Sequence, residues 1–146
     1  MQKHDDLRLS HQICFPLYAA SKEVIRRYRP FLDPLDLTYT QYITMMVMWE
    51  EKEINVKSLG EKLFLDSGTL TPVLKALEAK GYVRRGRSPE DNRVLTVTLT
   101  EEGAELKEAC REIPSCIASK CSALSQEEAL QLYGLLYKLL GGFAPE

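Results

Sequence analysis

The side chains in this sequence with the most chemistry available to them are four thiols, at Cys14, Cys110, Cys116 and Cys121. A thiol can be oxidised to a sulfenic acid, form a disulfide, or act as a small apolar side chain. The cysteines form no CxxC pair, and the two histidines, His4 and His11, lie far from the three distal cysteines in sequence. This spacing argues against a zinc site and leaves redox chemistry or packing as roles for the thiols.

Cys14 lies on the apolar face of a predicted helix, where a lone cysteine is usually inert. A reactive thiol needs a thiolate that is stabilised by a helix N-terminus, a cation or hydrogen-bond donors. No lysine or arginine lies within one turn of Cys14, and His11, three residues earlier, is a candidate donor on the same face. The neighbouring residues therefore leave both an inert and a reactive thiol open.

A second group of residues suited to binding is a basic cluster between positions 75 and 93. This segment holds six bases against three acids, although the whole chain has a net charge of −2. Its bases are Lys75, Lys80, Arg84, Arg85, Arg87 and Arg93. Because local charge steers a protein toward phosphates more than the total does, the cluster indicates a polyanionic partner.

Two helices are predicted ahead of this cluster. Apolar residues at helical spacing predict the first from Ser10 to Arg29, ended by Pro30. The second runs from Thr38 to Glu50, where Gln41 completes a capping box with Thr38. It is apolar nearly all round, which is typical of a helix at the centre of a domain.

A helix-turn-helix and a hairpin follow. Asn55 is placed to cap a short helix, and a further helix begins between Asp66 and Thr69 and ends at Gly81. Residues 82–87 and 94–100 have the composition and alternation of strands joined by a polar turn. This order predicts a winged helix-turn-helix.

The second helix of this motif presents polar and small residues away from its leucine stripe. They are Ser67, Thr69, Thr71, Pro72 and Lys75. Small hydroxyl side chains near a helix N-terminus can approach base edges and phosphates, although a solvated, capped helix face has the same composition.

The predicted wing carries Arg85, Arg87 and Arg93, and Asp91 is placed to pair with Arg93. Arginine suits phosphate contacts and insertion into a narrow minor groove. A hairpin with its charges in solvent is the plain alternative. The helix-turn-helix and the basic hairpin together predict binding to double-stranded DNA.

Helices are predicted again after the wing. A polar helix starts at Thr100 and is interrupted by Pro114, and Ser125 with Glu128 forms a second capping box. Residues 129–140 are apolar on more than one face. Since a monomer would expose much apolar area there, we expect this helix to pack against a second copy of the chain.

Length and composition set the class of protein. The 146 residues, 45% hydrophobic and 27% charged, predict one ordered domain, mainly α with a small β-hairpin wing. We expect dimerisation helices at about 10–37 and 101–146 around a winged-helix region at about 38–100. No apolar run is long enough to span a membrane and no secretory signal is recognisable, so a cytoplasmic location is expected.

Several motifs resemble the MarR family of dimeric winged-helix repressors. They are residues 56–63 (VKSLGEKL), residues 65–72 (LDSGTLTP) and residues 91–93 (DNR). The N-terminal motifs at 12–18 (QICFPLY), 28–30 (YRP), 32–33 (LD) and 37–42 (LTYTQY) are similar to the OhrR-like branch, which senses organic hydroperoxides. The resemblance covers about residues 12–103 and is loose beyond them.

The resemblance implies a homodimeric repressor on a pseudo-palindromic DNA operator, with no cofactor, metal or enzymatic activity. It implies that Tyr28 and Tyr39, from the partner chain or an adjacent helix, direct their hydroxyls at the Cys14 sulfur. Organic hydroperoxide would then oxidise Cys14 and release the operator. Cys116 and Cys121 are both candidates for a resolving thiol, or are ordinary apolar residues in a dimer interface.

Three other functions are compatible with parts of the sequence. A MarR-type regulator released by a phenolic or other small ligand would have a structural Cys14. A thiol peroxidase would turn over at Cys14, but no general base or peroxidase motif accompanies it. A dimerisation or adaptor module would have no use for an arginine-rich wing.

Overall fold

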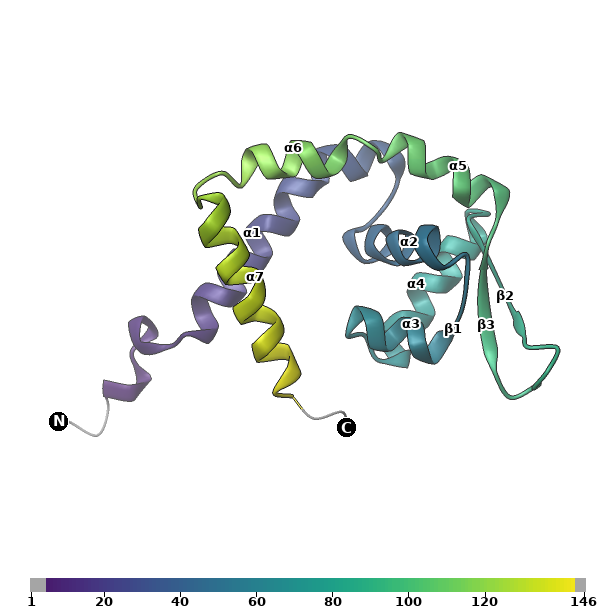
Figure 1. Ribbon diagram of the computed structural model, residues 1–146, viewed down its shortest axis with the longest axis horizontal. Helices are drawn as coiled ribbons and strands as arrows, with labels where there is room; N and C mark the ends of the chain where they lie inside the picture. Colours follow the sequence, from purple (N-terminus) through teal and green to yellow (C-terminus); the bar gives the residue numbers. More distant parts are fainter. Residues whose placement is uncertain (1–4, 144–146) are drawn as a thin grey trace. The chain divides into compact units, whose positions relative to one another are not determined.

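The computed structural model describes residues 5–143, which fall into two compact units divided between Ile113 and Pro114 (Figure 1). The elements of the first unit are η1 (Asp5–Leu7), η2 (Leu9–His11), α1 (Cys14–Leu32), η3 (Asp33–Leu35), α2 (Tyr39–Glu51), β1 (Glu53–Asn55), α3 (Val56–Leu63), α4 (Ser67–Ala79), β2 (Val83–Arg87), β3 (Leu95–Leu99) and α5 (Glu101–Ala109). Helix α6 (Ile113–Lys120) begins at the division, and α7 (Gln126–Gly141) belongs to the second unit. Many helices with one small sheet confirm the predicted fold class.

Helix α2 lies at the centre of the first unit, as predicted. The Thr38 hydroxyl accepts the Gln41 N–H, and the Gln41 side-chain oxygen accepts the Thr38 N–H, so the capping box is formed. Half of its apolar side chains are buried, namely Tyr42, Met45, Met48 and Trp49. The other elements of the first unit pack around this apolar helix.

Helices α3 and α4 form the predicted helix-turn-helix. Asn55 caps α3 and Asp66 caps α4, each accepting the third backbone N–H of its helix, at 2.7 and 2.8 Å. At Gly60, an added Cβ would lie 2.8 Å from the Leu65 carbonyl oxygen. Glycine therefore lets the turn fold back closely against α3.

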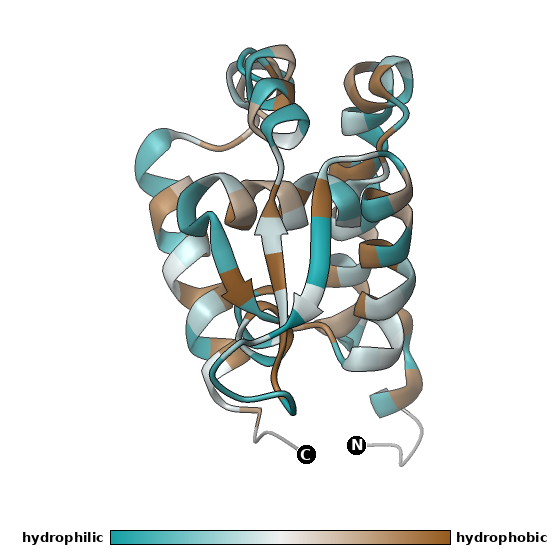
Figure 2. Ribbon diagram, turned by 90° about the vertical axis from the view of Figure 1, so that its right-hand side faces the viewer, coloured by the Kyte–Doolittle hydropathy of each residue, from teal (hydrophilic) through white to brown (hydrophobic). Residues whose placement is uncertain are grey.

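The wing is part of a three-stranded antiparallel sheet in which β3 lies between β1 and β2. Figure 2 shows the three strands facing the viewer, with the arginine-bearing strand β2 hydrophilic over most of its length. Strand β1 is an addition to the predicted elements, because the charged run at residues 50–53 (EEKE) is typical of a segment that leads into solvent. Its three residues pair with distant β3, with Ile54 opposite Val97, and local sequence does not reveal that pairing.

The predicted bounds of the first helix are wrong at both ends. Helix α1 begins at Cys14 instead of Ser10, because Gln12 is extended and donates its side-chain amide to carbonyls of the preceding turn. It also runs through Pro30 to Leu32. Because Pro30 has no N–H, the Arg26 carbonyl lacks its usual partner within the helix.

In the C-terminal helices, the predicted cap at Ser125 is confirmed, but the break predicted at Pro114 lies a few residues earlier. The Ser125–Glu128 capping box is formed at the start of α7. The interruption falls at residues 110–112, and Pro114 lies in the first turn of α6, where no N–H is needed. None of the described residues of α7 is buried. Among the described residues, no helix is long and apolar enough to cross a membrane.

Candidate nucleic-acid interface and thiol site

Helix α4 has one buried face and one exposed face. Leu70, Val73, Leu74 and Leu77 are buried. Four of the residues predicted to contact DNA are exposed on the other side, namely Ser67, Thr69, Pro72 and Lys75. The fifth, Thr71, is half-buried, and its hydroxyl donates to the Ser67 carbonyl at 2.7 Å. Its hydroxyl is therefore already engaged within the helix.

The start of α4 is held by Asp66. The Thr69 backbone N–H donates to its carboxylate, and hydrogen bonding with Thr69 lowers the pKa of Asp66. The remaining N–H groups of the first turn have no partner within the helix and give this end a partial positive charge. An exposed end of this kind attracts phosphate.

The wing presents three exposed arginines, Arg84, Arg87 and Arg93. The Arg93 side chain is 91% exposed, and it forms an ion pair with Asp91. The Asp91 Oδ1 atom accepts the Arg93 backbone N–H at 3.0 Å and its Nε–H at 3.3 Å. The predicted Asp91–Arg93 pair is formed and fixes the direction in which Arg93 leaves the turn.

Arg85 has a different environment from the other wing arginines. Its Nε and Nη2 atoms donate to Glu78 Oε1 at 3.3 and 3.1 Å, and its backbone N–H donates to Glu78 Oε2 at 2.9 Å. These bonds lower the pKa of Glu78. Because Glu78 lies on α4 and Arg85 on β2, the pair fixes the wing against the helix. No local spacing marks Glu78 as the partner of Arg85.

Cys14 is exposed and is the first residue of α1. Its apolar neighbours are exposed too, with Ile13 at 84%, Phe15 at 43% and Leu17 at 41%. The thiol therefore lies in an apolar surface that the described part of one chain leaves open.

Three tyrosines form a cluster at the far end of α1 and the start of α2. The ring centroids of Tyr28 and Tyr39 are 5.0 Å apart, and Tyr42 lies 5.7 Å from Tyr28 and 6.4 Å from Tyr39. Burial raises the pKa of Tyr39. Burial first, and then Tyr28, Cys110 and Tyr39, raise the pKa of Tyr42 to about 12. These two phenols stay protonated near neutral pH and are able to donate hydrogen bonds.

The predicted environment of the aromatic residues needs correction. Their positions in the sequence predict core-like environments for Phe15, Tyr18, Tyr42 and Trp49, but Phe15 and Tyr18 are 43% and 59% exposed. They lie on α1, whose apolar face has no cover in one chain, whereas Tyr42 and Trp49 lie on central α2. Tyr42 also joins the tyrosine cluster, a placement that its spacing alone did not indicate.

The tyrosine cluster and Cys14 of the same chain are well separated. Tyr28 follows Cys14 by 14 residues in the continuous helix α1. At a rise of 1.5 Å per residue, the two positions are roughly 21 Å apart along the helix axis. Tyr39 and Tyr42 lie beside Tyr28 and share this separation. The hydroxyls of one chain therefore cannot reach its own Cys14.

The other cysteines differ in accessibility, and all four thiols are free. Cys110 is buried at 3% exposure, and burial raises its pKa. Cys116 is partly exposed and Cys121 is exposed. Within residues 5–143, no three metal-binding side chains come together, and His4 lies outside that range.

The chain is similar to characterised and structurally solved regulators. The family model for the transcriptional regulator SarA/Rot matches residues 26–110. The chain is 47% identical to the organic hydroperoxide resistance transcriptional regulator of Bacillus subtilis over 138 residues, which is 94% of this chain and 93% of the relative. It is 54% identical to the HTH-type transcriptional regulator SarZ of Staphylococcus haemolyticus over 108 residues, 74% of each chain.

Solved structures of AbfR, which is known from Staphylococcus epidermidis, give the same assignment. Reduced AbfR bound to DNA superposes with a TM-score of 0.77 at 36% identity, covering 96% of this chain and 97% of that chain. A disulfide-formed AbfR superposes with a TM-score of 0.62 at 34% identity, covering 94% and 96%. With the family match and the helix-turn-helix geometry, these likenesses establish that the chain belongs to the SarA/Rot and MarR-type family of winged-helix, DNA-binding transcriptional regulators and is not an enzyme.

Proposed function

We propose that this regulator is a homodimeric repressor that senses organic hydroperoxides through Cys14 and then releases its operator. The observation that carries the proposal is the separation of Cys14 from the phenols of its own chain. An exposed thiol at one end of α1 and a cluster of phenols at the other are complementary halves of a site. Two antiparallel copies of α1 would bring them together twice, placing Cys14 of each chain against the partner subunit's Tyr28 and Tyr39.

The dimer is supported by the apolar surface left open on the terminal helices. Exposed on α1 are Leu17, Tyr18, Val24 and Ile25, and exposed on α7 are Leu130, Leu132, Tyr133, Leu135, Tyr137 and Leu139. Covering this surface with a second copy removes it from water, which is the dominant favourable term in association. We assign the whole chain, residues 1–146, to one MarR-type domain whose terminal helices form the dimer.

The exposed faces of α4 and the wing support a mode of DNA reading. Each α4 would lie in a major groove through Ser67, Thr69, Pro72 and Lys75, and Arg93 would reach the adjacent minor groove. Arg87 would contact phosphate. A two-fold dimer requires a pseudo-palindromic operator with half-sites about 34–36 Å apart.

The proposed chemistry begins with attack of the Cys14 thiolate on the distal oxygen of the hydroperoxide. The O–O bond breaks, the sulfur gains the distal oxygen and is oxidised to a sulfenic acid, and the peroxide is reduced to an alcohol. A phenol or water supplies the proton that the alkoxide takes up. The sulfenic acid then condenses with a second thiol, forming a disulfide and releasing water. Cys116 and Cys121 are both accessible enough to be that thiol, as is a small free thiol.

Operator release tests this function directly. Using a duplex selected from random sequences by the reduced protein, one equivalent of cumene hydroperoxide should release the parent protein and Cys110→Ser. Cys14→Ser should bind with the parent affinity and stay bound. Release of Cys14→Ser by the peroxide would contradict the proposal, as would release of the parent by salicylate but not by peroxide.

The same samples identify the oxidised product. Intact mass without reductant distinguishes an adduct with a small thiol from an intersubunit disulfide. If a protein thiol resolves Cys14, the disulfide mass should be lost in either Cys116→Ser or Cys121→Ser. Its persistence in both would leave the resolving role to neither residue.

A further inference from the structure

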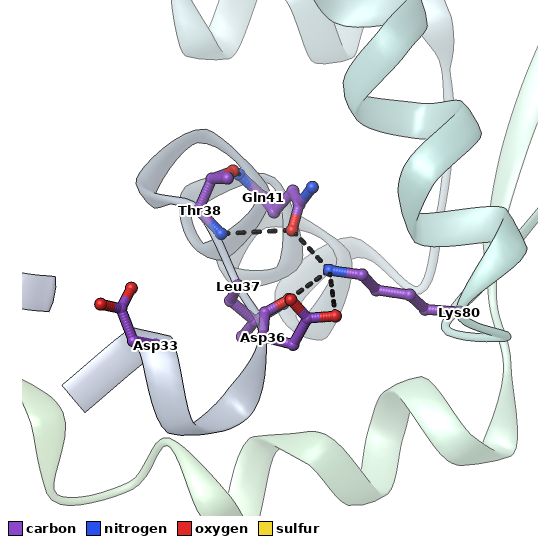
Figure 3. A pocket seen from close by; sticks show the side chains of 6 residues that line it. All are labelled: Asp33, Asp36, Leu37, Thr38, Gln41 and Lys80. Carbon is purple, nitrogen blue, oxygen red and sulfur yellow. Dashed lines mark hydrogen bonds and ion pairs between the residues drawn. The ribbon is translucent and has the colours of Figure 1, made fainter. Parts of the chain in front are cut away.

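Lys80 connects the end of α4, the recognition helix that we propose to read the DNA, to the turn that precedes α2. It is the residue directly after α4, and its side chain is 24% exposed. Figure 3 shows its ammonium group pointing into a pocket and meeting acceptors from that turn. The Nζ atom donates to the Asp36 carbonyl oxygen and to Gln41 Oε1, at 3.0 Å from the latter, and lies 3.6 Å from Asp36 Oδ2. One cation thus meets three acceptors, two of them on Asp36 of the turn and one on Gln41 in the first turn of α2.

The Gln41 side chain gives this contact its importance. Its Oε1 atom accepts both the Thr38 N–H of the capping box, at 3.2 Å, and Lys80 Nζ. Gln41 is only 8% exposed. Leaving this buried amide oxygen without its charged donor would cost free energy. We therefore expect the turn and Lys80 to move together.

The same turn positions the phenols. Tyr39 is the first residue of α2 and lies between Thr38 and Gln41, the two members of the capping box. Its ring contacts Tyr28 in the cluster that would face the partner subunit's Cys14. A displacement of Tyr39 therefore acts on the element to which Lys80 is bonded.

We propose that Lys80 is a positioning residue that couples the tyrosine cluster to the recognition helix. The inference rests on the proposed function. When the partner subunit's Cys14 gains an oxygen or a second sulfur, the phenols beside it must shift, and the capping box of α2 shifts with them. Lys80 transmits that movement to the end of α4, so the two recognition helices leave the spacing that fits the operator. Without Lys80, the thiol would still oxidise but the helices would respond less.

The test compares operator affinity before and after oxidation in Lys80→Met, which keeps the length and apolar stem of the side chain. Oxidation of Cys14 by cumene hydroperoxide is verified by intact mass. We expect reduced-state affinity close to that of the parent and an unchanged extent of oxidation. The ratio of oxidised to reduced Kd should fall by about fivefold or more, since coupling between two sites typically lies at 5-fold to 150-fold. Lys80→Arg, which retains a charged donor, should recover part of the ratio.

A matched control is Lys62→Met. Lys62 Nζ lies 3.4 Å from Glu51 Oε1, so it also makes an ion pair to α2, but from α3 and at the opposite end of α2. Its ratio of Kd values should equal that of the parent. A comparable fall in Lys62→Met would show that any lost ion pair weakens the response, and it would overturn the specific role of Lys80.

Asp36→Asn provides a second variant that spares the fold. Asp36 has a left-handed backbone, with φ of 53°, which asparagine also tolerates. Its ratio should fall, but by less than in Lys80→Met, because the carbonyl and Gln41 remain. A parent-like ratio in both variants, with the parent itself released by peroxide, would overturn this inference alone. Failure of peroxide to release the parent would overturn the proposed function as well.

Discussion

Helices α4 and α7 are both rich in leucine, but they use it differently. Helix α4 buries Leu70, Leu74 and Leu77 at 1% exposure or less inside its own chain. Helix α7 buries none of its residues against the described part of the chain, and Leu135 remains 63% exposed. The difference teaches that the winged-helix region has a core within one chain, whereas the apolar surface of the terminal helix is one that we propose a second copy covers.

The functional residues divide in the same way. All of the candidate DNA contacts lie on α4 and the wing, and two side-chain pairs, Glu78–Arg85 and Asp91–Arg93, fix them within one chain. Cys14 and the tyrosine cluster lie about 21 Å apart on one chain and would meet only across a dimer. In the proposed dimer, each subunit therefore carries its own DNA contacts, whereas each sensor site needs residues of both subunits.

The largest expected effect is loss of the dimer. Leu135→Glu with Leu139→Glu places two carboxylates on the exposed apolar face of α7, where burial against a second copy would be costly. Sedimentation should show a folded monomer, and operator affinity should fall roughly 100-fold or more because bivalent binding is lost. Lys138→Glu, on the polar face of the same helix, serves as the control. A dimer that survives the double substitution would refute the assignment of α7.

Truncating one leucine in each helix sharpens the contrast. Leu74→Ala should lower the free energy of unfolding by about 2–5 kcal/mol at every protein concentration, because its cavity forms within one chain. The effect of Leu135→Ala should depend on protein concentration, because that side chain is covered only in the dimer. Urea unfolding at two concentrations a hundredfold apart would measure both. Equal concentration dependence for the two variants would remove the distinction between the helices.

At the wing, Arg93→Ala should weaken operator binding by about 1–3 kcal/mol and lower the slope of log Kd against log salt by about one, while the dimer persists. Arg111→Ala is the comparison, since that arginine pairs with Glu108 on the surface near α5. A salt titration by fluorescence anisotropy measures both slopes. Unchanged affinity and slope in Arg93→Ala would exclude the wing tip from the interface.

The smallest expected effect concerns pH. Hydrogen bonds hold the pKa values of Asp66, Glu78 and Glu128 below their ordinary range in the folded protein. These hydrogen bonds contribute fully to stability above the pKa of the unfolded state, at about 4. The contribution is lost as the pH falls through the lower pKa values of the folded state. Glu78→Gln should therefore make stability less dependent on pH in acid. Urea unfolding between pH 7 and pH 3 tests this, and a steeper acid loss in Glu78→Gln would contradict it.

Sequence reasoning predicted the features that depend on neighbouring residues. The capping boxes at Thr38 and Ser125 are three-residue patterns, and both are formed. Helix α1 was placed too early and stopped too soon, because the extended Gln12 and the tolerance of Pro30 depend on surrounding structure. Periodicity identified an apolar face containing Leu17 and Val24, but it could not say that a single chain leaves this face open.

Contacts between segments that are far apart in the chain could not be predicted from the sequence. Strand β1 exists because β3, some forty residues later, pairs with it. The partners of Arg85 and Lys80 are side chains on other elements, and nothing in local spacing marks them. The position of Cys14 at the start of a helix likewise needed the structure.

Two mixed dimers test whether the sensor is assembled across subunits. In the first, a Cys14→Ser chain pairs with a Tyr28→Phe, Tyr39→Phe chain, so the remaining Cys14 faces intact phenols of its partner. In the second, a parent chain pairs with a chain carrying all three substitutions, so the remaining Cys14 faces altered positions. The account predicts that one equivalent of cumene hydroperoxide oxidises Cys14 and releases operator quickly in the first dimer and slowly in the second. Equal rates, or a faster second dimer, would contradict it.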